Sequence, residues 1–303
     1  MSAGGSPVTD QDAARREALI AAMPAVFVAI WSTGFVVARL AMPHAPPFTF
    51  LCWRYAFSVL AFGAWIAWAR PAWPQGRAQW GHLAVSGVLM HAGYLGGVWA
   101  AVRAGIPAGT VALVVGLQPL LTAVWESARG QHRVAPAQWA GLLLGLAGLS
   151  LVVWPKMGTG QVTGWNLTLS LLALACITAG TLYQKRHVRP VDVRTGNAVQ
   201  LAAALAVSWP FALLEPAAMT WNAEVLTALA WSVFGLSLGG SSLLMMLIQR
   251  GAATRVTSLM YLVPPCTAVL AWLLFDEAMA GMAWIGMALC AAGVGLVLRS
   301  GRR

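Results

Sequence analysis

Charged residues are scarce in this 303-residue chain: 9% of its residues are Asp, Glu, Lys or Arg, whereas 59% are hydrophobic. A soluble domain usually carries about 25% charged residues, so the composition excludes a protein whose whole surface meets water. The apolar runs are also continuous and lack the alternation that the strands of a membrane barrel would show. The sequence therefore predicts an all-α polytopic membrane protein.

Acidic residues are absent from the middle of every long apolar run. This absence disfavours proton antiport through a membrane-embedded carboxylate, and it leaves His91 as the only mid-run side chain that titrates near neutrality. The four cysteines lie inside apolar runs without metal-ligand spacing, and Gly239-Gly-Ser-Ser242 does not form the G-x-S-x-G nucleophile motif. We therefore expect no metal site, no cofactor and no enzymatic activity.

Ten apolar stretches are long enough for the roughly 20 residues that a helix needs to cross a bilayer. They are Leu19–Val37, Phe48–Ala69, Trp80–Val102, Pro107–Trp125, Ala135–Trp154, Trp165–Tyr183, Thr195–Leu214, Val225–Ile248, Thr254–Phe275 and Gly281–Leu298. We interpret the first stretch as an uncleaved anchor, because no small-residue cleavage site ends it. The predicted fold thus has ten transmembrane helices.

The second half of the chain repeats the plan of the first half. At one constant offset, Gly105, Leu113 and Pro119 match Gly251, Leu259 and Pro265. After a shift of one residue, Trp139, Gly141 and Gly148 match Trp284, Gly286 and Gly293. Extending the alignment backward sets Trp31 against Cys176 and Arg54 against Gln200. We predict two five-helix repeats, residues 19–155 and 162–299, between a disordered N-terminus (1–18) and a short C-terminus (300–303). Because five is odd, the repeats would have inverted topology.

Basic residues fall almost entirely on one side of the predicted bundle. If both termini share a side, that side holds fifteen of the 19 Lys and Arg residues, and the other side holds Arg39, Arg103 and Lys156. The positive-inside rule then places both termini in the cytoplasm, beneath a bacterial inner membrane. The net charge of +10 reflects this topology and contact with anionic lipid, and it does not indicate nucleic-acid binding. Glycine-rich faces on the closing helix of each repeat suit a scaffold or a dimer contact, so a monomer and a homodimer both stay open.

Three kinds of residue inside the apolar runs are candidates for function. Arg54 lies within the second helix, where a charge either snorkels to the outer interface or serves a substrate or a gate. His91 and Tyr94 share one face of the third helix, although a histidine there can also simply bind a neighbouring carbonyl. Pro119 and Pro265 are equivalent helix kinks that each free a backbone carbonyl, and such kinks either line a pathway or only bend a helix for packing.

These features resemble the drug/metabolite transporter superfamily in its EamA-type, ten-helix layout. The similarity rests on the Trp-Ser pair in the first helix, the arginine in the second, the G…P pattern of the fourth and ninth, and the closing W-x-G-x-x-L/M-x-x-x-G helices. The segments Trp31–Arg39 and Phe50–Arg54 look most similar to YddG-like amino-acid exporters. The resemblance implies a central cavity with these matching residues: Trp31, His91, Tyr94, Trp99, Gln118, Thr178, Ser242 and Tyr261.

The resemblance also implies export of aromatic and other neutral amino acids by alternating access through that cavity. Without a carboxylate in the apolar runs, neutral polar groups and aromatic faces would hold the zwitterion, and facilitated diffusion is the expected mechanism. Two alternatives stay open: a proton-coupled drug or metabolite efflux transporter, and a membrane scaffold or sensor that transports nothing. The expected partners are an amino acid and the lipid bilayer.

Overall fold

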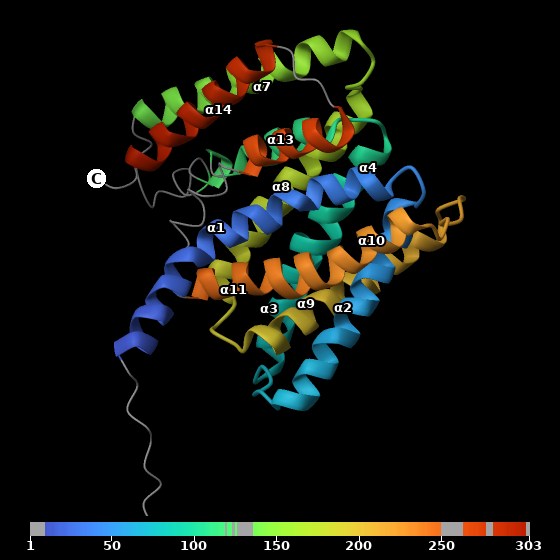
Figure 1. Cartoon of the computed structure of the whole chain (residues 1–303), viewed down its shortest axis with the longest axis vertical. Helices are drawn as coiled ribbons and strands as arrows, with labels where there is room; N and C mark the ends of the chain where they lie inside the picture. Colours follow the sequence, from blue (N-terminus) through green and yellow to red (C-terminus); the bar gives the residue numbers. More distant parts are fainter. Residues whose placement is uncertain are drawn as a thin grey trace, which may run out of the picture.

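The computed structural model describes residues 10–118, 120–122, 125, 136–249, 263–276 and 281–300. Every regular element in these ranges is a helix (Figure 1). The helices of the first half are α1 (Asp10–Ala41), α2 (Pro47–Ala69), α3 (Arg77–Gly87), η1 (Val88–Gly93), α4 (Tyr94–Arg103), α5 (Ala108–Val115) and α7 (Pro136–Gly158). Those of the second half are α8 (Gly164–His187), α9 (Val193–Leu213), α10 (Ala223–Trp231), η2 (Ser232–Ser241), α11 (Ser242–Gln249), α13 (Val263–Phe275) and α14 (Gly281–Ser300).

Length and hydropathy mark six helices in the described part of the chain as able to cross a membrane. They are Pro47–Ala69, Arg77–Arg103, Trp139–Gly158, Gly164–His187, Val193–Leu213 and Ala223–Leu247. Four shorter apolar helices accompany them: Ala25–Ala41, Ala108–Thr122, Val263–Phe275 and Gly281–Gly293. The prediction of an all-helical, multi-pass membrane protein is confirmed. Each predicted stretch overlaps one of these helices, while the count of ten crossings stays a prediction.

Two of the long helices change to the wider π-helical winding near their middle. The π segment η1 joins α3 to α4, and η2 joins α10 to α11, in each case without a break in the helix. A π turn alters the backbone hydrogen-bond ladder locally and is frequent at functional sites. Here η1 packs on α9 and η2 packs on α2, so each π segment meets a helix of the other half.

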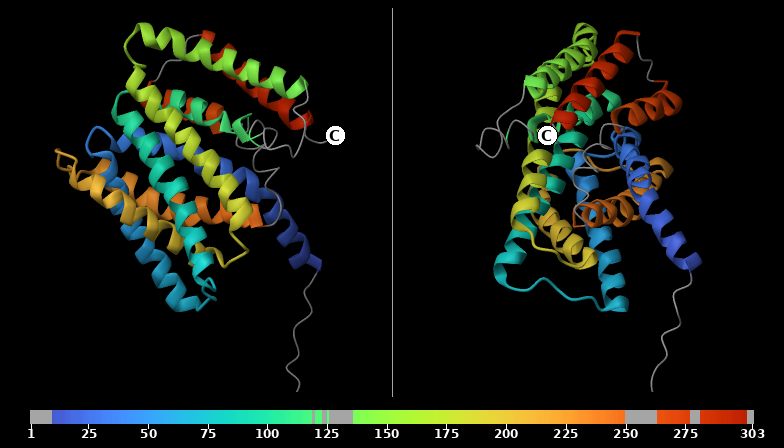
Figure 2. Two further views of the ribbon diagram at one scale, coloured as in Figure 1. Left: turned by 180° about the vertical axis from the view of Figure 1, so that it is seen from behind. Right: turned by 90° about the vertical axis from the view of Figure 1, so that its left-hand side faces the viewer.

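The helices pack in pairs that join the two halves of the chain. Helix α2 lies along α9, α5 along α13, and α7 along α14. The α7–α14 pair forms one edge of the molecule, at the top of Figure 1 and in both views of Figure 2. Helix α1 packs on α13 and on α10 and η2, whereas α8 packs on α5 and on η1 and α4. The core between them is filled by large buried side chains, among them Phe27, Phe50, Tyr55, Phe62 and Trp99.

Glycines bring α7 and α14 into backbone contact. A Cβ atom at Gly148 would lie 2.4 Å from the carbonyl oxygen of Gly286, and one at Gly293 would lie 2.4 Å from that of Gly141. No side chain fits at such distances, so glycine is required for the two backbones to approach this closely. The predicted glycine-rich faces therefore meet each other within one chain, although a Cβ at Gly295 would meet nothing within 4 Å.

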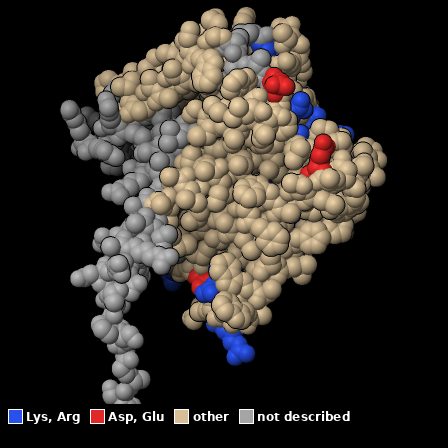
Figure 3. Space-filling view, viewed as in Figure 1, with Lys and Arg blue, Asp and Glu red and all other residues tan. Residues whose placement is uncertain are grey.

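The outer surface suits a lipid environment. Figure 3 shows a face on which uncharged residues form a broad area, with the coloured charges near its edges. Large apolar side chains are exposed on several helices, including Trp68 (83% exposed), Trp154 (77%) and Trp165 (67%). Tryptophan is enriched where a membrane protein meets the lipid headgroups. The helices thus present apolar side chains outward as well as toward the core.

Long-range hydrogen bonds fasten the starts of α2 and α3 to loops of the second half. At the start of α2, the carboxylate of Glu215 accepts hydrogen bonds from the backbone N–H groups of Phe48 (2.8 Å) and Thr49 (2.7 Å). In the first turn of α3, the side-chain amide of Gln79 exchanges two hydrogen bonds with the backbone of Arg189 (3.0 and 3.3 Å). The two halves are therefore joined at both ends of the bundle as well as through its core.

Candidate functional site

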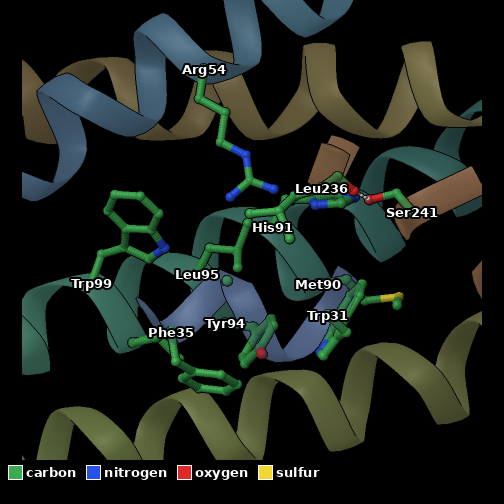
Figure 4. A pocket seen from close by; sticks show the side chains of 12 residues that line it. Trp31, Phe35, Arg54, Met90, His91, Tyr94, Leu95, Trp99, Leu236 and Ser241 are labelled. Atoms are coloured by element: carbon green, nitrogen blue, oxygen red, sulfur yellow. Dashed lines mark hydrogen bonds between the residues drawn. The ribbon is translucent and has the colours of Figure 1, made fainter. Parts of the chain in front are cut away.

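A small cavity lies inside the bundle, where α1, α2, η1, α4 and η2 meet (Figure 4). Its volume is about 30 Å³, which is enough for one or two water molecules and too little for an amino acid. Its aromatic lining includes Trp31, Phe35 and Trp99. The cavity is therefore closed to substrates of ordinary size in this structure, and a substrate would need side chains or helices to move.

Arg54 brings a positive charge to this cavity from α2. Its side chain is 4% exposed, and its Nε donates a hydrogen bond to Ser237 Oγ on η2 at 3.2 Å. Figure 4 shows the guanidinium group extending from α2 toward the cavity. The described residues that line the cavity include no Asp or Glu. This placement fits the interpretation of Arg54 as an inward-facing charge and does not fit a side chain that snorkels to the interface.

The π segment η1 is held between α2 and α9 at His91. This residue lines the cavity and is 5% exposed. Tyr55, which follows Arg54 on α2, donates its hydroxyl proton to the backbone carbonyl of His91 at 2.9 Å. Helix α9 also packs on η1. A carbonyl that bonds a side chain of another helix is the kind of interaction that a π turn permits.

Aromatic side chains separate the cavity from a second small space. The rings of Trp31 and Tyr94 stack with 6.4 Å between their centroids and 3° between their planes. Both rings, with Phe35, line the central cavity on one side and a gap of about 10 Å³ on the other. Gln118 lines this gap and donates its amide proton to Thr181 Oγ1 at 3.0 Å. The stacked rings therefore divide two small, mostly apolar spaces within the bundle.

Four of the predicted substrate residues line the central cavity together with Arg54: Trp31, His91, Tyr94 and Trp99. Gln118 lies beyond the stacked rings. Thr178 instead lines a wider hollow of about 770 Å³ beside Tyr183 on α8. The Thr178 hydroxyl donates to the carbonyl of Leu174 at 2.7 Å, as hydroxyls inside membrane helices commonly do. The structure thus brings five of the candidates to one place and leaves Gln118 and Thr178 apart from them.

The remaining candidates lie near the cavity or outside the described residues. Ser242 is buried at the start of α11, and its hydroxyl has no hydrogen-bond partner within the protein, whereas its neighbour Ser241 lines the cavity. Pro265 lies in α13, and the adjacent Pro264 lines the second space. Tyr261 and Pro119 fall outside the residues that the structure describes. In both described cases the residue that lines a space directly precedes the predicted one.

Ser237, the partner of Arg54, was not among the predicted residues. It stands in Gly235-Leu-Ser-Leu-Gly239, which has the spacing of the G-x-S-x-G motif. A nucleophile elbow requires a sharp turn from strand to helix, whereas Ser237 lies inside the helical segment η2. The motif therefore does not indicate a nucleophile here. The alignment that pairs Arg54 with Gln200 also pairs His91 with Ser237. Because His91 was already a candidate, this equivalence could have identified Ser237 as a candidate in the second half.

A neutral polar cluster surrounds Gln200, the counterpart of Arg54. The Gln200 amide donates to Gln184 Oε1 at 3.2 Å and to Ser86 Oγ at 3.4 Å. The Ser86 hydroxyl donates to the same Gln184 oxygen at 2.8 Å. All three side chains are buried, and none of the three lines the central cavity. Their hydrogen bonds join α3, α8 and α9 without any charge.

A multi-pass helical bundle with a closed, partly polar cavity inside it is an architecture typical of a membrane transport protein. Comparison with known families agrees with this class. The model of the EamA-like transporter family matches residues 18–154 and, a second time, residues 164–299. The chain belongs to the EamA-like transporter family, within the drug/metabolite transporter superfamily that its sequence motifs resemble.

Two curated relatives carry the name "probable amino-acid metabolite efflux pump". The protein of Salmonella typhimurium is 24% identical over 277 residues, which cover 88% of this chain and 90% of the relative. The Escherichia coli K12 protein has the same identity and coverage. A solved crystal structure matches 93% of this chain and 98% of its own chain with a TM-score of 0.68 at 20% identity, which bears on the fold alone.

Proposed function

We propose that this chain exports aromatic and other neutral amino acids across a bacterial inner membrane by alternating access, with both termini in the cytoplasm. The observation that carries the proposal is the closed central cavity, in which aromatic rings surround the buried guanidinium of Arg54. Aromatic faces suit an apolar side chain and attract an ammonium group. The names of the two efflux-pump relatives support the same substrate class.

Alternating access would follow from two inverted five-helix repeats, residues 19–155 and 162–299. The pairing of helices supports this architecture, because exchanging the halves turns several contacts into others that are also present: α1 with η2 becomes α8 with η1, and α1 with α13 becomes α8 with α5. The two matches of the family model fall on the same two ranges. Two such bundles can exchange conformations and so open one cavity to either side.

The hydrogen bonds of the two halves suggest one change to the repeat alignment. Ser32 donates to the carbonyl of Val28, and Thr178 donates to that of Leu174, with oxygen–oxygen distances of 2.7 Å in both cases. The offset that relates Arg54 to Gln200 pairs Ser32 with Thr178 and Trp31 with Ile177, whereas the offset one residue shorter pairs Trp31 with Cys176. The first repeat alone contributes an aromatic ring at this place, so the cavity need not be symmetric.

The proposed mechanism is uniport, because the described cavity residues offer no carboxylate to exchange a proton for the substrate. His91 lines the cavity, and its backbone carbonyl accepts a hydrogen bond from Tyr55. We expect His91→Ala to retain most of the downhill flux in a well-folded protein. Complete loss of flux in such a protein would show that transport depends on the imidazole and would favour proton coupling.

Liposomes that contain the purified protein test the proposal. Labelled phenylalanine, leucine and a cationic drug are offered with and without an imposed pH gradient. Saturable flux of the two amino acids that ignores the gradient would support uniport of neutral amino acids. Flux of the drug alone, driven by the gradient, would instead indicate a proton-coupled drug transporter. Absence of flux and of substrate-induced thermal stabilisation would indicate a scaffold or a sensor.

A further inference from the structure

We infer that Arg54 is the anchor for a carboxylate group of the substrate, and that the site recognises this carboxylate more strictly than it recognises an amine. The inference rests on the proposed transport function and names its substrate class: small carboxylates with an apolar or aromatic side chain. This class includes amino acids and also their derivatives in which the amine is acylated or absent.

The charge inside the cavity is the first observation. Arg54 is only 4% exposed, and its hydrogen bond to Ser237 uses the Nε atom. The two terminal nitrogens extend toward the cavity (Figure 4). Arginine stays charged at any physiological pH, and a buried cation without a counter-charge is strongly unfavourable. The described cavity residues provide no carboxylate, so the missing counter-charge fits an anionic group of the ligand.

The shape of the site favours a carboxylate. The planar guanidinium presents parallel N–H groups, which match the two oxygens of a carboxylate. The closed cavity of about 30 Å³ has room for a group of that size next to Arg54, while the rest of a substrate would need the rings of Trp31 and Tyr94 to move. Ser241 adds a hydroxyl to the lining. An ammonium group would find aromatic faces there, whose attraction is weaker than a charge pair.

The equivalent position in the second half indicates that helix packing does not require this charge. Gln200 occupies the counterpart of Arg54, where α9 packs on η1, and its side chain makes neutral hydrogen bonds to Ser86 and Gln184. At the crossing of α2 with η2, the guanidinium makes one hydrogen bond, to Ser237. A charge that the fold does not need, aimed into a cavity, is better explained by a ligand than by packing.

The test compares three ligands with the wild-type protein and with Arg54→Gln, which copies the residue of the equivalent position. The ligands are phenylalanine, N-acetylphenylalanine without the ammonium, and phenylalanine amide without the carboxylate. Thermal stabilisation of the purified protein reports binding, and counterflow in liposomes reports transport. Arg77→Gln removes an exposed arginine at the start of α3 and is the matched control. Chloride is titrated in a parallel series, because this small inorganic anion carries the same single negative charge as a carboxylate.

We expect phenylalanine and N-acetylphenylalanine, but not the amide, to bind the wild-type protein and the control variant. Arg54→Gln should weaken the binding of both carboxylate ligands by about 30-fold or more. This is the lower end of the effect of removing one partner of a buried charge pair. It should not lower the melting temperature of the ligand-free protein, because it removes an uncompensated charge. If Arg54→Gln does not fold, Arg54→Lys should weaken the carboxylates by about 10-fold, since lysine lacks the bidentate fork.

Equal binding of the amide and phenylalanine, or unchanged carboxylate affinity in a folded Arg54 variant, would overturn the inference. The inference would also be overturned if chloride raised the melting temperature and the carboxylate ligands raised it no further. Carboxylate binding that Arg54→Gln abolishes, without any flux in wild-type liposomes, would support the anchor and contradict the transport proposal. Failure of the proposed function is thus distinguishable from failure of the carboxylate site.

Discussion

The crossing of α2 with η2 and the crossing of α9 with η1 occupy equivalent places in the two halves, yet they differ in how closely the helices approach. A Cβ atom at Gly87, which precedes η1, would lie 2.3 Å from the backbone oxygen of Gln200. The corresponding residue beside α2 is Val233, a buried β-branched side chain. A glycine thus admits one backbone to the other where α9 crosses η1, whereas the equivalent residue where α2 crosses η2 is a buried valine.

The polar residues at the two crossings differ in the same sense. Gln200 belongs to a neutral cluster of hydrogen bonds within the protein, whereas Arg54 directs a charge into the central cavity. One crossing thus combines a close backbone approach with neutral hydrogen bonds, and the other directs a charge into a cavity. The comparison teaches that equivalent helix crossings in two repeats can serve different roles: the crossing of α9 with η1 suits stability, and the crossing of α2 with η2 suits the proposed binding.

The largest expected effect on stability comes from placing a side chain at Gly87, where the helices approach most closely. Gly87→Val places side-chain atoms where the backbone of Gln200 lies, so α3 and α9 must move apart. Overpacking costs about 1–3 kcal/mol and sometimes more, and we expect the upper end because backbone cannot rotate aside. The yield of monodisperse protein and its melting temperature measure this. Gly63→Val, at a site on α2 where a Cβ would meet nothing within 4 Å, should leave both near wild type.

The next effect tests the neutral cluster. Gln200→Ala removes the donor to Gln184 and Ser86 and leaves buried acceptors less satisfied. We expect a loss of about 1–3 kcal/mol in stability, as for other buried groups that lose a hydrogen-bond partner. Ligand affinity should change little, because Gln200 does not line the cavity. A variant with normal stability and lost ligand binding would place the binding site at this crossing and would contradict the comparison.

A smaller effect is expected at the start of α2, which has no N-cap side chain of its own. The Glu215 carboxylate from the second half takes the place of that cap. It accepts hydrogen bonds from the backbone N–H groups of Phe48 and Thr49 and from the Thr49 hydroxyl. Glu215→Gln keeps one acceptor oxygen and should cost about 0.5–2 kcal/mol, the range for loss of a helix cap. Thermal unfolding measures it. Glu224→Gln is the control, because its carboxylate is 53% exposed and pairs with a half-buried histidine. Equal effects of the two changes would show that Glu215 acts only as a surface charge.

The smallest effect is expected at the start of α9, which has a local cap. Asp192 accepts from the backbone N–H of Arg194 and also bonds its guanidinium, and these bonds lower the pKa of the Asp192 carboxyl below its usual value. The resulting stabilisation is present above the carboxyl's unfolded pKa and is lost as pH falls through the lower folded value. Asp192→Asn removes this stabilisation at pH 7, but the loss in melting temperature should be small, since Asn also caps helices. Its difference from wild type should shrink further below about pH 4. A large loss at pH 7 would mean that α9 depends on this charge.

The amino-acid sequence by itself determined the class of the protein and the existence of its helices. Scarce charge and long apolar runs require lipid around the chain and hydrogen-bonded backbone within each segment. The same patterns located the glycine faces of α7 and α14, and they placed Arg54, His91, Tyr94 and Trp99 inside apolar segments. These properties depend on composition and local spacing, so they can be predicted without knowing which helices touch.

Only the tertiary structure decided which buried polar groups meet. Helical periodicity places Arg54 and Gln200 on faces of α2 and α9, but it does not say that one face meets a cavity and the other meets Ser86 and Gln184. It also did not separate Thr178 from the central cavity or identify Ser237 as the partner of Arg54. Contacts between residues more than 100 positions apart depend on how closely whole helices approach, and a single glycine or valine at a crossing changes that distance.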